Sequence, residues 1–158
     1  MSRSQNRPDA QPLDELMLDR FLPYRLSVLS NRVSKAIAAR YAAEFDLSIP
    51  EWRVIAVLGR CEAGQAASDI IEATEMDKVA ISRAVARLIA KKRVLAQSDP
   101  ADGRRQLLRL SAEGRRVYAR IAPVALECEA RLIALLTETE RKQLDDLVTR
   151  LSLAACEL

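Results

Sequence analysis

The segment SDPADGRRQLLRLS, residues 98–111, contains the only Pro-Ala-Asp-Gly sequence of the chain, followed by a short run of alternating leucines. Proline, aspartate and glycine in this order favour a tight turn. The runs 93–98 and 105–111 on either side alternate apolar and polar residues, as short antiparallel strands do. We therefore predict a β-hairpin with a basic tip.

Two helices are predicted at the start of the chain. Residues 13–45 place apolar side chains at helical spacing, and we expect Pro23 to kink this helix. A second helix begins after Ser48, because Ser48 and Glu51 have the spacing of a capping box. Pro50 suits the first turn of this helix, where its missing N–H is not needed.

A pair of helices joined by a short turn precedes the hairpin. The first is short and begins at Ala67 or Ser68, and its inward side chains are expected to be Ile70, Ile71 and Ala73. Asp77 can cap the second, residues 77–92. Its buried face is expected to contain Ile81, Val85 and Leu88, together with Val79 or Ala80.

The helical period returns after the hairpin, over residues 113–136. Thr137 and Glu140 form a second capping-box pattern, which begins a last helix over 138–158. The whole order predicts a mostly α-helical fold with a small β-hairpin wing. This is a winged helix-turn-helix arrangement, in which the second helix of the pair enters the major groove of DNA.

The outer face of that second helix supplies the candidate DNA contacts. Its first turns can reach base edges, and Arg87 lies one turn further along, better placed for a phosphate. The wing can reach the adjacent minor groove or its phosphates, with Asp102 bracing Arg104 across the turn. The candidate DNA-binding residues are Lys78, Val79, Ser82, Arg83, Arg87, Asp102, Arg104 and Arg105.

Composition and charge agree with this interpretation. The chain has 158 residues, of which 49% are hydrophobic, with few glycines and prolines, a balance that favours one mostly helical domain. Residues 77–109 contain nine Lys or Arg and three Asp, a net charge of +6 in a chain whose total is +3. A basic segment on a slightly acidic body is typical of a polyanion-binding protein. A solvated helix face beside a charged loop is the alternative.

Several classes of protein are disfavoured. The chain has no histidine, the commonest general base and a common metal ligand, and no Gly-rich phosphate loop or nucleophile elbow. We expect neither catalysis, nor a metal, nor a cofactor. Three widely spaced cysteines without a CxxC pair fit a reducing cytoplasm, and no apolar run reaches the ~18 residues of a membrane span. Residues 1–12 resemble a flexible tail.

The chain resembles the MarR (multiple antibiotic resistance regulator) family from about residue 18 to residue 151. The wing pattern of that family falls on Asp99, Asp102, Arg104, Leu108, Leu110, Ser111 and Gly114. Ser82 and Arg83 match a Thr/Ser-Arg pair in its recognition helix. Gly103 stands where arginine is usual, which puts some wing contacts in doubt. Lys92 replaces a common glycine and predicts a less regular helix end.

The resemblance implies a homodimer that reads an inverted repeat. Residues 13–45 and 112–158 would form the dimerisation helices, and residues 46–111 the DNA-binding lobe. The many apolar positions over 13–33 and 117–156 agree, since they exceed what a monomer of this size needs to cover itself. Alternatively, these helices wrap the core of a monomer.

The resemblance also implies a small ligand that releases DNA, commonly a phenolic or aromatic carboxylate, here an aromatic acid or its CoA thioester. The candidate pocket residues are Tyr24, Ser27, Ser30, Asn31, Trp52 and Arg53. An arginine among them could pair with a carboxylate. Equally, Trp52 could be a core residue and Arg53 a surface charge.

Two other functions stay open. One is an architectural or protein-interaction module that uses the winged fold without sensing a small molecule. The other is redox sensing through a cysteine, although Cys61, Cys128 and Cys156 lie in helix-like apolar contexts where an inert thiol is expected.

Overall fold

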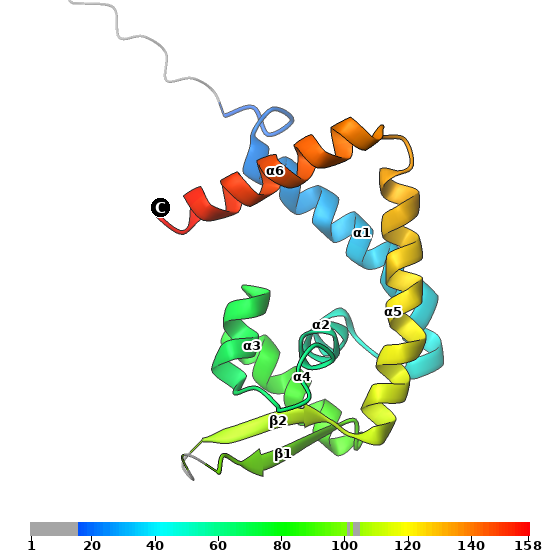
Figure 1. The fold of residues 1–158 in the computed structure, drawn as a ribbon, viewed down its shortest axis with the longest axis vertical. Helices are drawn as coiled ribbons and strands as arrows, with labels where there is room; N and C mark the ends of the chain where they lie inside the picture. The colour runs from blue at the N-terminus through cyan, green and yellow to red at the C-terminus, as the bar shows by residue number, and fades with distance from the viewer. Residues whose placement is uncertain (1–15, 101, 103–104) are drawn as a thin grey trace, which may run out of the picture. The chain divides into compact units, whose positions relative to one another are not determined.

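The computed structural model describes residues 16–100, 102 and 105–158, so the predicted tail over 1–12 lies outside it. The chain divides into two compact units, Met1–Arg32 and Val33–Leu158. The helices and strands follow the predicted order (Figure 1): α1 Leu22–Phe45, α2 Ile49–Leu58, α3 Ala67–Thr74, α4 Lys78–Ala90, β1 Val94–Ser98, β2 Gln106–Leu110, α5 Ala112–Ile133 and α6 Glu138–Ala155. None of the described helices combines the length and the apolar character that crossing a membrane requires.

The first helix begins later than its apolar pattern predicts. A turn over 18–20 precedes α1, and Pro23 is the second residue of the helix. The expected kink at Pro23 is therefore wrong. A proline in the first turn removes an N–H that has no partner within the helix, so it leaves the hydrogen-bond ladder intact.

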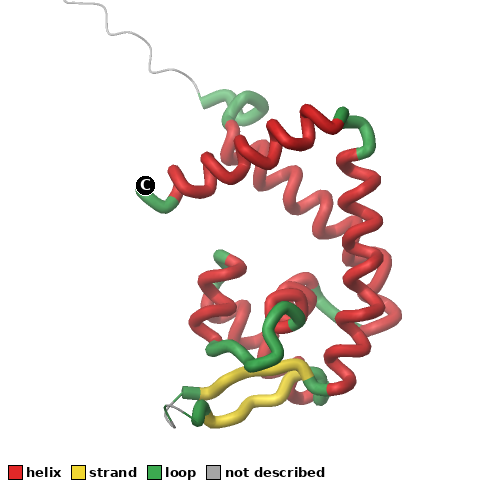
Figure 2. The backbone as a smooth tube through the Cα atoms, viewed as in Figure 1, coloured by secondary structure: helices red, strands yellow, loops and turns green. Residues whose placement is uncertain are grey.

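The second unit contains a winged lobe, formed by α2, α3, α4, β1 and β2. The three helices pack on one another, and the hairpin packs on all three of them and on α5 (Figure 2). The strands pair antiparallel from Val94↔Leu110 to Ser98↔Gln106, which confirms the predicted hairpin. Gln65, just before α3, adds two backbone hydrogen bonds to Leu108, at 2.9 and 2.8 Å.

Apolar side chains from every element of the winged lobe form its core. The fully buried ones come from α2, α3, α4 and β1, joined by residues of α1 and α5: Tyr41, Val54, Ile55, Ile70, Ile81, Leu88, Val94, Val117 and Ile121. Ile81, Val85 and Leu88 face inward as predicted, with Ala80 rather than Val79 completing the stripe. Ala73 was predicted inward but is exposed, because Ile70, Ile71 and Thr74 occupy the inner face of α3.

Both predicted capping boxes are present. The Ser48 and Thr137 side chains accept from the backbone of Glu51 and Glu140, whose carboxylates bond back to the capping residues. Asp77 caps α4, with its carboxylate accepting from the backbone N–H groups of Val79 and Ala80 at 2.9 and 3.0 Å. These short-range signals locate the starts of three helices.

The C-terminal end of α4 is more regular than the substitution of glycine by Lys92 predicts. Lys92 has a φ of 56°, in the left-handed region. Its N–H donates to the carbonyl of Ile89, and the N–H of Arg93 donates to that of Leu88, both at 2.9 Å. This is a complete Schellman motif, with lysine in the position that usually holds glycine.

The left-handed conformation of Lys92 predicts a stabilising substitution. Glycine adopts this conformation without the steric cost that a Cβ imposes, so we expect Lys92→Gly to raise the free energy of unfolding by about 0.5–1 kcal/mol. Chemical denaturation measures the change. Lys92→Ala is the matched control, because it keeps the Cβ and should bring no gain; an equal gain from alanine would attribute the effect to the lost charge instead.

Candidate nucleic-acid interface

The orientation of α4 follows from its buried face. Ile81, Ala84 and Leu88 are buried against the core of the winged lobe. Side chains on the opposite side of the helix therefore project into solvent. The Asp77 cap fixes the first turn, where a recognition helix contacts base edges.

Five of the predicted DNA-contact residues lie on this outer face. Their side chains are all exposed, and Val79 is 53% exposed. Within the described part of the chain, none of the three cations among them takes part in an ion pair, so their charges face solvent uncompensated. This set comprises Lys78, Val79, Ser82, Arg83 and Arg87.

The wing lies beside this helix, and β1 follows α4 directly. At its tip the N–H of Asp99 donates to the carbonyl of Arg105, and the N–H of Arg105 donates to the carbonyl of Asp102. The guanidinium of Arg105 lies 3.9 Å from the carboxylate of Asp69 on α3, and half of the Arg105 side chain is exposed. Arg104 and Gly103, and with Arg104 the predicted Asp102–Arg104 brace, lie outside the described residues.

The predicted effector residues fall in both units of the chain. Tyr24, Ser27, Ser30 and Asn31 belong to the first unit and are exposed along α1. Trp52 and Arg53 belong to the second unit and are partly buried. Arg53 donates to the hydroxyl of Ser34 at 3.3 Å, so it is not a simple surface charge.

An aromatic stack surrounds Trp52 inside the second unit. Its ring lies 5.8 Å from that of Tyr41 and 6.2 Å from that of Tyr118. Tyr41 is buried, and its hydroxyl has no hydrogen-bond partner among the described residues. Burial raises the pKa of Tyr41 to about 12, although the charge of Arg53 opposes this shift. Trp52 thus packs against the core, the alternative that its sequence position left open.

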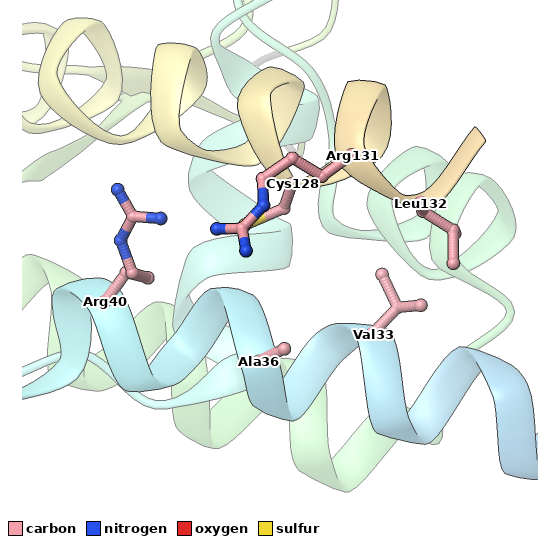
Figure 3. Close-up of a pocket in the computed structure, with 6 residues that line it drawn as sticks. All are labelled: Val33, Ala36, Arg40, Cys128, Arg131 and Leu132. Atoms are coloured by element: carbon pink, nitrogen blue, oxygen red, sulfur yellow. The ribbon is translucent and has the colours of Figure 1, made fainter. Parts of the chain in front are cut away.

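A cleft that the sequence interpretation missed lies between α1 and α5 of the second unit. Its volume is about 380 Å³, and Figure 3 shows the guanidinium groups of Arg40 and Arg131 towards one end and Val33 and Leu132 at the other. Arg40 is held by Glu127 at 3.0 Å, whereas Arg131 has no ion-pair partner among the described residues. Ala36 and Cys128 complete the lining. The helical spacing of residues 33, 36 and 40, which places them on one face of α1, is the sequence pattern that could have indicated this cleft.

The surroundings of the cysteines differ in part from the expected ones. Cys128 lies on α5 in the apolar cleft, but Cys61 lies in the loop after α2, where its thiol donates to the carbonyl of Gly64 at 3.7 Å. Cys156 is exposed at the end of α6. The helix-like apolar context predicted for Cys61 is therefore wrong, because the chain leaves α2 at Leu58 and turns towards α3.

A helix pair within a three-helix core, an outward basic helix face and a flanking hairpin define a DNA-binding winged helix-turn-helix lobe. A family model described as the MarR family matches residues 45–105, which cover α2 to the wing. No curated protein matches the sequence significantly.

Solved structures of this family share the fold over most of the chain. A MarR/EmrR family transcriptional regulator from Acinetobacter sp. ADP1 is 26% identical, with a TM-score of 0.82 over 90% of this chain and 100% of that one. The PcaV transcriptional regulator from Streptomyces coelicolor, in complex with its natural ligand, is 26% identical, with a TM-score of 0.73 over 90% and 99%. CouR from Rhodococcus jostii RHA1, bound to p-coumaroyl-CoA, is 19% identical, with a TM-score of 0.74 over 87% and 95%. The winged lobe of this chain thus matches the MarR family model, and its fold is shared by solved MarR-family regulators.

Proposed function

We propose that this protein is a ligand-responsive transcriptional regulator, a repressor that binds a pseudo-palindromic operator as a homodimer. The observation that carries the proposal is the uncompensated basic face of α4 beside the hairpin. Arginine can bind guanine through two hydrogen bonds in the major groove, and wing cations add phosphate or minor-groove contacts. The protein acts in the cytoplasm and has no catalytic role.

The homodimer is supported by unpartnered apolar side chains on both terminal regions. α6 has no buried residue, yet its apolar positions follow helical spacing at Leu144, Leu147, Val148 and Leu151. The described part of the first unit likewise exposes Leu16, Met17, Leu18, Phe21, Leu22, Leu26 and Leu29. A two-fold dimer buries the same surface on both chains. We therefore assign 13–45 and 112–158 to dimerisation and 46–111 to DNA binding.

The effector we propose is an aromatic acid or its CoA thioester. Support comes from the relatives solved with a natural ligand and with p-coumaroyl-CoA. The arginine that would pair with the acid is Arg53, within the set of Tyr24, Ser27, Ser30, Asn31, Trp52 and Arg53. The α1–α5 cleft offers a second arginine, Arg131, at the end of an apolar lining.

A gel-shift titration on the DNA that flanks its own gene tests this function, with and without aromatic acids and their CoA thioesters. We expect sequence-selective binding that one compound of the panel reverses. Selective binding that no compound affects would favour an architectural module, and release by peroxide would favour a cysteine sensor. If an acid acts, Arg53→Ala and Arg131→Ala separate the two acid sites, since only one of them should abolish its effect.

The first variant to test on DNA is Arg83→Ala. Because Arg83 lies near the start of the recognition helix, we expect operator affinity to fall by ~1–3 kcal/mol per half-site and the base preference at one position to relax. Competition against operators altered at single base pairs measures both effects. Arg87→Ala, one turn away, is the matched control and should weaken specific and random DNA equally. If Arg83→Ala also weakened binding to specific and random DNA equally, Arg83 would be a phosphate contact like Arg87.

A further inference from the structure

The ammonium group of Lys91, at the C-terminal cap of α4, has three acceptors. It donates to the Glu51 carboxylate at 3.0 Å and lies 3.1 Å from the Asp46 carboxylate. It also donates to the backbone carbonyl of Asp46. Asp46 directly follows α1, and Glu51 belongs to the first turn of α2. One side chain thus joins the ends of three helices.

Glu51 is the buried partner in this cluster, with 2% of its surface exposed. Burial would raise the pKa of its carboxyl, but hydrogen bonds from the Ser48 N–H and hydroxyl and from Lys91 outweigh it, and the pKa is lowered. The distances from Ser48 are 2.8 and 2.7 Å. A buried, ionised carboxylate needs a cation held close to it, so the position of Lys91 is strongly constrained.

A lysine at the end of a recognition helix would ordinarily be counted among the phosphate contacts. An ammonium group has three hydrogens to donate. Lys91 donates two of them, to the Glu51 carboxylate and to the Asp46 carbonyl, and the exposed Asp46 carboxylate pairs with the ammonium charge at 3.1 Å. Two carboxylates thus compensate the charge of Lys91, in contrast to the cations on the outer face of α4, which have no ion-pair partner among the described residues. The next residue, Lys92, is exposed and takes part in no ion pair within the described part of the chain.

We infer that Lys91 is a positioning residue for DNA reading, which ties the end of α4 to the corner between α1 and α2 and so sets how the recognition helix meets the groove. The inference rests on the proposed function. The contacts of α4 with α2, α3 and β1 hold the helix in the lobe. The Lys91 cluster adds a link to the end of α1, the helix in which the predicted effector residues Tyr24, Ser27, Ser30 and Asn31 lie.

The test compares Lys91→Met with Lys92→Met at several salt concentrations. A positioning residue changes the fit to the operator without changing the number of neutralised phosphates. We expect Lys91→Met to lower operator affinity about tenfold and to leave the slope of log K against log salt unchanged. Lys92→Met should keep the operator affinity within about twofold of the wild-type value. Lys91→Arg, which can pair with both carboxylates, should retain most of the wild-type affinity.

Circular dichroism checks that each variant is folded, and a milder substitution provides a second test. Asp46→Asn removes the solvent-exposed carboxylate and leaves the buried pair in place, so it should fold and lower operator affinity by a factor of about two to three. Folded Lys91→Met and Asp46→Asn proteins that bind like wild type would overturn the inference. A salt slope that falls by roughly one per subunit would also do so, by making Lys91 a phosphate contact. If wild-type protein binds no operator, the proposed function fails instead.

Discussion

A protein that carries Leu147→Glu and Leu151→Glu together should be monomeric and should lose at least about a hundredfold in operator affinity. Both leucines are about half exposed on α6, within the apolar stripe that we assign to dimerisation. Two carboxylates in the centre of an apolar interface would be buried without partners. Because the two lobes of a dimer bind one DNA molecule together, separating them removes the second half-site. Sedimentation and gel-shift measurements on the same preparation check both effects.

The matched control is Lys142→Gln with Thr149→Glu, on the opposite face of α6. This pair makes the same change in net charge at exposed positions, so it should keep the dimer and the operator affinity. A Leu147→Glu, Leu151→Glu protein that stays dimeric would show that α6 is not part of the interface. A monomer that kept full affinity would contradict the two-half-site mechanism.

Gly114→Ala should destabilise the fold by about 2–3 kcal/mol and lower the melting temperature by about 5–10 °C. A Cβ on Gly114 would lie 2.1 Å from the carbonyl oxygen of Arg93. That oxygen cannot withdraw easily, because it accepts the N–H of Ser111 at 2.9 Å. The hydroxyl of Ser111 caps α5 by accepting from Gly114 at 3.0 Å. Gly114 thus permits the close approach of α5 to the base of the wing.

Helix propensity and the close contact with Arg93 predict opposite signs for the change in stability caused by Gly114→Ala. Alanine in a helix is favoured over glycine by about 1 kcal/mol, so helix propensity alone predicts that Gly114→Ala is stabilising. Glu113→Ala, at the exposed neighbouring position, is the control and should change stability by less than about 1 kcal/mol, the worth of its surface ion pair with Arg116. A stabilised Gly114→Ala protein would show that the backbone at Arg93 yields to the added methyl group.

Local chemistry made most of the fold predictable. The capping boxes at Ser48 and Thr137 and the Asp77 cap depend on residues within a few positions of one another. The same holds for the outer face of α4, since the burial of Ile81 and Leu88 decides where Arg83 and Arg87 point. Helical period alone could not locate the start of α1, because the apolar positions before Leu22 keep the same spacing outside the helix.

Side-chain partners far apart in the sequence were decided by the tertiary structure. Glu51 was predicted only as a capping residue, and its pairing with Lys91, 40 positions away, arises because α2 and α4 pack together. The packing of the hairpin on α3 likewise brings Arg105 towards Asp69, and Trp52 of α2 lies between Tyr41 of α1 and Tyr118 of α5. Apart from the start of α1, the sequence by itself determined where the helices and the hairpin form and which helix face is basic, because those properties depend on neighbouring residues. Which charges are buried and paired depends on how the helices pack, since desolvation and ion pairing act between side chains that only the folded chain brings within a few ångströms.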